Sequence, residues 1–388
     1  MSTAGKAPSL LLLRAGRVFA PEPLGRQDVL IGGGRVLRTA PDLSVLCRSL
    51  PPDAVIDAPR GTLLPGLIDQ HLHFLGGGEG DGARMPELTF AAIASGGITT
   101  AISLLGTDIR FKTLPMLLRR ANELSEAGLT TFIYTGAMAL PPPSITGNIF
   151  SDVVLLDRVI GAKSAIAERL FPNTDLTALA ELAGQLAQAR AISGKAAALH
   201  LHVGRGAEGL DRVFDLTQRL GLPADQVVPT HVNRNPEHSP AFAQALEHAR
   251  AGGTIDLTCC LGPLDGLPAG MDVVVAVRTA LDAGVPLSRM TLSSDAGVAV
   301  PDPSDHGRLR QVPPSILFRD LRRLVHEAGL RWDEAVTLAT TNVARLLRLD
   351  ARKGCIGEGM DADLLLLNEA DDIDAVFSAG KLIHESPR

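Results

Sequence analysis

Cysteine is scarce in this chain of 388 residues: there are four, at positions 47, 259, 260 and 355, and no two have the C-x-x-C spacing. An adjacent pair is not typical of a disulfide scaffold, so the cysteines favour a reducing cytoplasm and buried free thiols. A surplus of positive charge is also missing, because 37 lysines and arginines are set against 43 aspartates and glutamates, a net charge of −6. The chain therefore has no basic footprint for nucleic acid.

Long apolar runs are missing as well. The run "SLLLLRAG" at residues 9–16 is short and is interrupted by Arg14, which predicts a buried strand rather than a secretory signal. No stretch approaches the roughly 20 apolar residues that cross a bilayer. With 45% hydrophobic and 21% charged residues, the composition is typical of a soluble protein with a sizeable core, long enough for a large barrel or sheet and an accessory domain.

Both ends of the chain have a pattern of short strands and turns. Near the start, "DVLIGGGRVLRTA" indicates a hairpin and "AVIDAPRGTLLPG" a further strand pair. Near the end, "GCIGEGMDADLLLLN" and "DAVFSAGKLIHE" alternate strand and turn again. We expect residues 1–66 and 346–388 to form one small β-sandwich domain from both termini.

The middle of the chain, residues 67–345, alternates β-branched apolar runs with Ala- and Leu-rich stretches of helical spacing, such as "DLTALAELAGQLAQARAIS". Glycine follows several of these helical stretches where a helix C-terminus is expected. Eight such runs predict a (β/α)₈ barrel, with a doubly wound sheet as the alternative. The strands are expected near residues 67–73, 98–104, 130–136, 159–164, 196–202, 227–231, 253–258 and 290–295.

Metal-ligand side chains recur where these predicted strands end. "LIDQHLHF" places His71 and His73 two residues apart, so both side chains lie on one face of the first strand. The strand ends of a (β/α)₈ barrel meet at one mouth, where reacting groups are found. The other candidates are Lys163 on strand four, His202 on strand five, His231 on strand six and Asp295 on strand eight.

Four neutral imidazoles and a carboxylate suit zinc or a similar divalent ion. Lys163 does not fit as an ammonium, because a cation repels metal ions. As a neutral amine it can add CO₂, which gives an oxygen ligand able to bridge two metals and leads us to expect two divalent ions per chain.

The motifs "LLPGLIDQHLH", "LLGTD", "VIGAKSAI", "THVNRN", "TLSSD" and "GMDADLLLL" occur in the order typical of one family. The chain resembles the amidohydrolase superfamily, and more narrowly the isoaspartyl (β-aspartyl) dipeptidases. The resemblance implies that His71 and His73 hold one metal, that His202 and His231 hold the other, and that carboxylated Lys163 bridges them. It implies further that Asp295 is both a ligand and a proton shuttle, and that the protein is a homo-oligomer.

The resemblance also implies residues that contact a dipeptide-like zwitterion. Glu79, in the glycine-rich loop, corresponds to the acid that takes the α-amino group. Thr107 of "LLGTD" is a further polar contact, and Arg234 of "THVNRN" binds a carboxylate. Arg169 is the candidate for a second carboxylate binder, with a solvated surface arginine as the alternative.

Two family positions differ in this chain. The family has a tyrosine at the end of the third strand that polarises the scissile carbonyl, and here the motif reads "YTGAM", with Met138 in that place. Tyr134 lies four residues earlier, roughly 13 Å along a strand, and cannot replace it. The family serine beyond the eighth strand is Ala299 here. The remaining histidines are interpreted as core (His200) or surface residues (His238, His248, His306, His326).

The sequence therefore predicts a binuclear metal-dependent hydrolase that cleaves an amide bond in β-aspartyl dipeptides. Another amidohydrolase reaction, on a cyclic amide or an N-acyl amino acid, is the first alternative. A metal-binding protein with little catalysis is the second.

Overall fold

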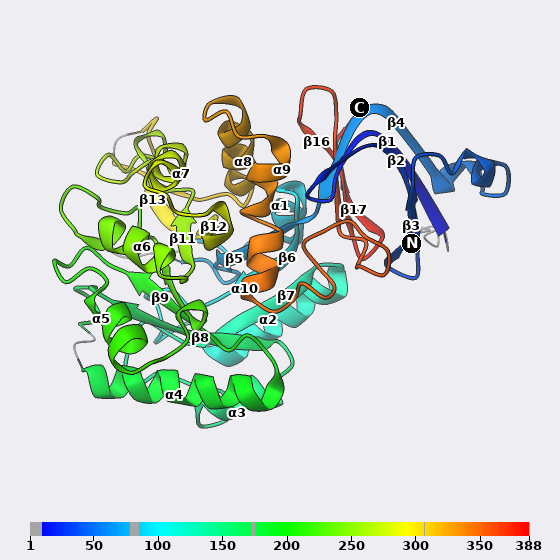
Figure 1. The fold of residues 1–388 in the computed structure, drawn as a ribbon. Coiled ribbons are helices and arrows are strands. Elements are labelled where there is room, and N and C mark those ends of the chain that lie inside the picture. The colour runs from blue at the N-terminus through cyan, green and yellow to red at the C-terminus, as the bar shows by residue number, and fades with distance from the viewer. Residues whose placement is uncertain (1–9, 78–84, 173–174, 306, 388) are drawn as a thin grey trace.

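The central unit is an eight-stranded parallel sheet that curls into a barrel (Figure 1). The computed structural model describes residues 10–77, 85–172, 175–305 and 307–387. All eight strands predicted in the middle of the chain are present. They are β5 (Leu67–Leu72), β6 (Ile98–Ser103), β7 (Thr130–Gly136), β8 (Val159–Ile166), β9 (Ala198–Val203), β10 (Val227–Thr230), β11 (Ile255–Thr258) and β12 (Met290–Ser293).

The barrel closes where β5 meets the chain that follows β12. A parallel bridge joins Leu72 and Ala296. The Asp295 amide donates to the His71 carbonyl at 2.9 Å, and the His73 amide donates to the Ala296 carbonyl at 2.7 Å. These bonds set two predicted ligand segments, far apart in the sequence, side by side. The predicted (β/α)₈ fold is confirmed.

Helices surround the barrel (Figure 1). The longest, α4, begins after Asp175, whose carboxylate caps the amides of Thr177 and Ala178, and ends before Gly194 in a left-handed conformation. In the part of the chain that is described, no helix is both long and apolar enough to cross a membrane. The helices are α1 (Phe90–Ser95), α2 (Leu114–Ala127), α3 (Ile149–Leu155), α4 (Leu176–Ser193), α5 (Asp211–Phe214), α6 (Ala241–Arg250), α7 (Val273–Asp282), α8 (Ile316–His326), α9 (Trp332–Thr337) and α10 (Thr341–Leu346).

Both ends of the chain build a second, seven-stranded sheet with its own apolar core. Strand order is β17-β16-β15-β4-β1-β2-β3, so the C-terminal strands pair with β4 beside the N-terminal ones (Figure 1). The edge strand β3 is bonded to the segment before β15, where the Val36 amide donates to the Met360 carbonyl at 2.9 Å. The strands are β1 (Leu10–Phe19), β2 (Pro23–Gly32), β3 (Arg35–Ala40), β4 (Val55–Pro65), β15 (Leu364–Leu367), β16 (Ile373–Ser378) and β17 (Lys381–Glu385).

Gly66 separates the two sheets, since β4 ends at Pro65 and β5 begins at Leu67. A side chain there would meet the Thr99 side chain at 2.5 Å, which explains the glycine. The division into domains at residues 66 and 346 fits this break and stays a prediction. A small hairpin, β13 (Ala299–Pro301) with β14 (Leu309–Gln311), follows the barrel's last strand and lies at its mouth.

Candidate metal centre at the barrel mouth

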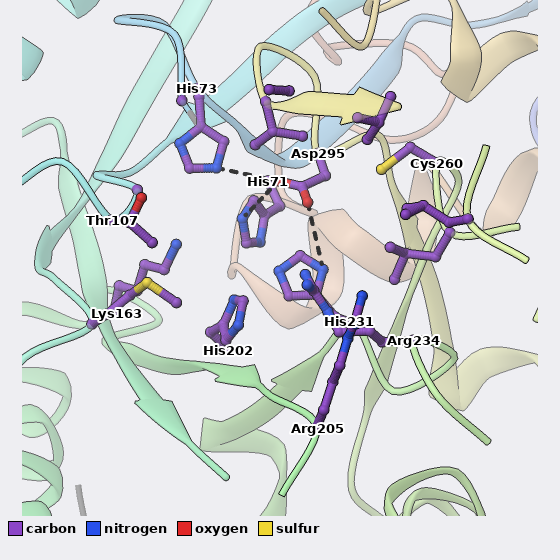
Figure 2. Close-up of a pocket in the computed structure, with 18 of the residues that line it drawn as sticks. His71, His73, Thr107, Lys163, His202, Arg205, His231, Arg234, Cys260 and Asp295 are labelled. Atoms are coloured by element: carbon purple, nitrogen blue, oxygen red, sulfur yellow. Dashed lines mark hydrogen bonds and ion pairs between the residues drawn. The ribbon is translucent and has the colours of Figure 1, made fainter. Parts of the chain in front are cut away.

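A cavity of about 290 Å³ opens at the carboxyl ends of the barrel strands (Figure 2). Its lining brings together all six predicted metal ligands, which come from five strands: His71, His73, Lys163, His202, His231 and Asp295. All six side chains are buried. Figure 2 shows the four imidazoles facing one space, with the Asp295 carboxylate reaching into it.

Asp295 is the point on which the histidines converge. Its Oδ1 lies 3.2 Å from Nε2 of His73 and 3.4 Å from Nε2 of His71, and its Oδ2 lies 3.8 Å from Nδ1 of His231. One ligand atom from each of His71, His231 and Asp295 falls within 4.8 Å of the other two. The buried Nε2 of His71 has no hydrogen-bond partner among the described residues, as expected of an atom that binds a metal.

Two of these residues have a strained backbone. His231 and Asp295 have φ of 64° and 54°, in the left-handed region that non-glycine residues rarely adopt. Each follows the end of its strand, β10 or β12, so the unusual turn redirects the side chain into the cavity. Strain of this kind, about 1–3 kcal/mol per residue, is retained where the site requires the geometry.

His200 was interpreted from the sequence as a core residue, and it is fully buried, but it also contacts a predicted ligand. Its Nε2 lies 2.8 Å from Nδ1 of His71, and its ring stacks on Tyr134 with centroids 4.8 Å apart. If Nε2 of His71 holds a metal, Nδ1 carries the proton and donates it to His200. His200 thereby fixes the orientation and tautomer of His71, which is the usual role of an outer partner.

Two other histidines predicted as ligands have hydrogen-bond partners that the sequence did not reveal. The Thr258 hydroxyl lies 2.8 Å from Nδ1 of His231, which leaves Nε2 free for the cavity. Nε2 of His202 lies 3.2 Å from Oε2 of Glu168. A carboxylate can only accept, so Nε2 carries the proton and the lone pair of His202 is on Nδ1.

The state of charge suits metal binding. Burial lowers the pKa values of His71 and His231 well below that of a free imidazole, and it lowers the pKa of His202 to about 4. These three imidazoles are therefore neutral near pH 7. Lys163 is 1% exposed, and burial lowers its pKa to about 7 despite the opposing charge of Asp295. Near pH 7 a large share of Lys163 is therefore the neutral amine, the form that can attack CO₂.

Beneath the centre, inside the barrel, Asp256 accepts four hydrogen bonds from side chains. The donors are Gln70, Thr230, Thr291 and Ser293, at 2.6–2.8 Å. Burial still raises the pKa of Asp256 to about 6. This network ties β5, β10, β11 and β12 together under the ligands, and so supports the barrel wall from which His71 and His231 project.

Only some of the residues predicted to contact the substrate line the cavity. Thr107 and Arg234 line the cavity, and Glu79 lies outside the described residues. Arg169 is exposed and is absent from the lining, because Ala167, with φ of 52°, turns the chain so that Glu168 points inward to His202 instead. Arg205, which the sequence analysis did not single out, lines the cavity.

The two family positions that differ are both at the cavity. Met138 is 2% exposed and Ala299 begins β13, and both line it. Tyr134 is fully buried in the barrel interior against His200, outside the lining. The six predicted metal ligands are therefore brought together, while a thioether occupies the position at which the resemblance implied a hydroxyl donor.

A (β/α)₈ barrel with histidine, lysine and aspartate side chains gathered at its mouth has the arrangement of an enzyme site that can hold metal ions. Residues 146–379 match the family described as the amidohydrolase family, and the chain belongs to it. It is similar over 97% of both chains to the β-aspartyl dipeptidase of Fervidobacterium islandicum AW-1, with 34% identity and a TM-score of 0.85. A second structure of that enzyme, in complex with a β-Asp-Leu dipeptide, has 33% identity and a TM-score of 0.86.

Relatives with other reactions match more weakly. Adenine deaminase 3 of Rhizobium meliloti is 25% identical over 98% of this chain, but the match spans 59% of the deaminase. A dihydroorotase of Pediococcus pentosaceus is 30% identical over 98 residues, 22% of its length. The likeness therefore extends to a deaminase and a dihydroorotase, each over only part of its length.

Proposed function

We propose that this protein hydrolyses the amide bond of β-aspartyl dipeptides. The observation that carries the proposal is the cavity itself, where six buried metal-ligand residues stand beside Arg234 and Thr107. The likeness to the β-aspartyl dipeptidase over 97% of the chain supports the same substrate class.

The residues present fit two divalent ions, with zinc the best match to neutral imidazoles and one carboxylate. We propose that His71 and His73 hold one ion, that His202 and His231 hold the other, and that Lys163, carboxylated on Nζ, and Asp295 complete the ligands. When bound, such ions polarise a carbonyl and activate water. The unpaired Nε2 of His71 and the lowered pKa of Lys163 support this fit.

Three side chains at the cavity have separate roles in the proposed reaction. Asp295, held against His71 and His73, takes the proton of the attacking water and returns it to the leaving amine. Arg234 binds a substrate carboxylate at the rim, three residues after His231. Thr107 provides a further polar contact on the opposite wall.

A substrate panel tests the proposal. The zinc-loaded protein is expected to cleave β-aspartyl-leucine. It should cleave α-aspartyl-leucine, dihydroorotate, adenine and N-acetyl-leucine much more slowly or not at all. The measurement is kcat/KM for each compound under identical conditions. Fast turnover of one of the other compounds, with none of the β-aspartyl dipeptide, would assign the chain to a different amidohydrolase reaction.

Replacing Met138 with tyrosine is expected to raise kcat on a β-aspartyl dipeptide at least tenfold. A thioether has no hydrogen to offer a developing oxyanion, and one such donor is worth about 10²–10³ in kcat. Met138→Phe is the matched control, since it adds the ring without the hydroxyl and should give no gain. A wild type that is already fast, with a slower Met138→Tyr, would show that Met138 is adapted to its own substrate.

A further inference from the structure

The tetrapeptide pattern His-Val-x-Arg occurs twice at the barrel mouth. It reads His202-Val-Gly-Arg205 at the end of β9 and His231-Val-Asn-Arg234 directly after β10. These strands are neighbours and pair in parallel, with Thr230 opposite His202. In both copies the histidine and the arginine line the cavity.

Each copy is held in a fixed conformation, for a different reason. Around Arg205, the Gly204 amide donates to the Ile166 carbonyl at 2.9 Å and the Gly206 amide to the Ala167 carbonyl at 2.8 Å. A side chain at Gly204 would lie 2.2 Å from the Ala167 carbonyl oxygen, so this copy requires glycine.

In the second copy, Asn233 takes the place of the glycine. Its amide nitrogen donates to the carbonyls of Thr258 and Met271 at 3.0 and 2.9 Å, and its oxygen accepts from the Thr258 amide at 3.0 Å. The two arginines are thus carried on short, anchored turns, and Figure 2 shows both side chains extending to the cavity.

The two arginines have few negative charges around them, so the cavity favours an anionic ligand. In the described part of the chain, Arg205 and Arg234 line the cavity together with a single carboxylate, Asp295. Within that part, neither arginine side chain has an ion pair, and the buried Nε of Arg234 has no hydrogen-bond partner. Arg205 and Arg169 are both exposed, but Arg205 lines the cavity and Arg169 stands outside it.

We infer that Arg205 is a substrate-binding residue that anchors one of the two carboxylates of a β-aspartyl dipeptide, while Arg234 anchors the other. The inference rests on the proposed function for the identity of the substrate. Arg205 thereby takes the role of second carboxylate binder, which the resemblance implied for Arg169. The chain selects substrates with two carboxylates on either side of the scissile amide.

Three substrates separate the two carboxylates. β-Aspartyl-leucine has both, β-aspartyl-leucinamide lacks the one on the leaving residue, and β-alanyl-leucine lacks the one beside the amino group. Arg205→Ala is expected to lower kcat/KM on β-aspartyl-leucine about 10- to 100-fold, mainly through KM, the scale of a lost charge-assisted bond. On whichever of the other two substrates lacks the carboxylate that Arg205 binds, Arg205→Ala should have the same kcat/KM as wild type. Arg234→Ala should match wild type on the other of these two substrates.

Arg169→Ala is the matched control and should stay within about twofold of wild type on all three substrates. Equal losses for Arg205→Ala on every substrate, or no loss on β-aspartyl-leucine, would overturn the inference. A wild type that cleaves none of the three would instead contradict the proposed function.

Calorimetry with succinate, a dicarboxylate, gives a readout that needs no turnover. Its Kd is expected to weaken about tenfold or more in Arg205→Ala and to be unchanged in Arg169→Ala. An unchanged Kd in Arg205→Ala, or no binding of succinate to wild type, would remove Arg205 from the site whatever the reaction.

Discussion

Replacing Lys163 with alanine is expected to remove most of the bound metal and to lower kcat by at least about a thousandfold. Two unit charges 4 Å apart repel by about 4 kcal/mol at an effective dielectric constant of 20, and two dications by roughly four times more. An anionic bridge offsets this repulsion, and the neutral amine of buried Lys163 can supply it after CO₂ addition. Elemental analysis and steady-state kinetics on the same sample measure both effects.

Two comparisons make this prediction specific. Acetate or propionate, which can enter the space left by the side chain, should partly restore metal and activity to Lys163→Ala. Lys112→Ala removes a lysine whose Nζ donates to the Gly76 carbonyl at the same mouth, and it should keep its metal. Two fully bound ions in Lys163→Ala, or an unmodified ammonium beside two full metals in a high-resolution map, would contradict the bridge.

Asp295→Asn should lower kcat by about 10²–10⁴ and leave most of the metal in place. Burial alone would raise the pKa of Asp295, but the hydrogen bond with His73 and the positive charge of Arg234 outweigh it and lower that pKa, so the carboxylate is ionised. Asparagine preserves the shape and one ligand oxygen, and it cannot accept a proton. The variant thus separates proton transfer from metal binding.

The measurement is single-turnover kinetics at matched metal content. A variant that holds its metal and retains more than about a tenth of wild-type kcat would show that another group moves the proton. Loss of both ions would mean that Asp295 acts first as a ligand, and its catalytic role would then have to be tested with the metal saturating.

The strands, and the gathering of the candidate ligands at one mouth, could be predicted because both depend on local pattern. β8 is a run of small and apolar residues interrupted by Lys163 and Ser164, and the alternation that sets His71 and His73 on one face is readable from spacing alone. Motifs at strand ends meet at one mouth in any (β/α)₈ barrel, so Lys163, His231 and Asp295 could be grouped before the fold was known.

The contacts that the sequence did not reveal depend on the register between strands and on turns of the backbone. The contact of His200 with His71 follows from the depth at which β9 and β5 face each other across the barrel, which no local spacing gives. His248 was expected at the surface but is buried, with Nε2 3.2 Å from the Val227 carbonyl, because α6 turns that face to the barrel.

Arg205 lines the cavity and Arg169 does not, and this difference depends on the left-handed turn at Ala167, a conformation that the residue types in that stretch do not predict. The repeated His-Val-x-Arg pattern was present in the sequence, and it would have pointed to Arg205 had the two strand ends been compared with each other.

Zinc titration of the metal-free protein tests the central claim most directly. Hydrolysis of β-aspartyl-leucine would be measured against the number of zinc ions bound per chain. The account predicts no turnover without zinc and a rise that saturates near two ions. Turnover that survives complete removal of metal, or none at full occupancy, would contradict it.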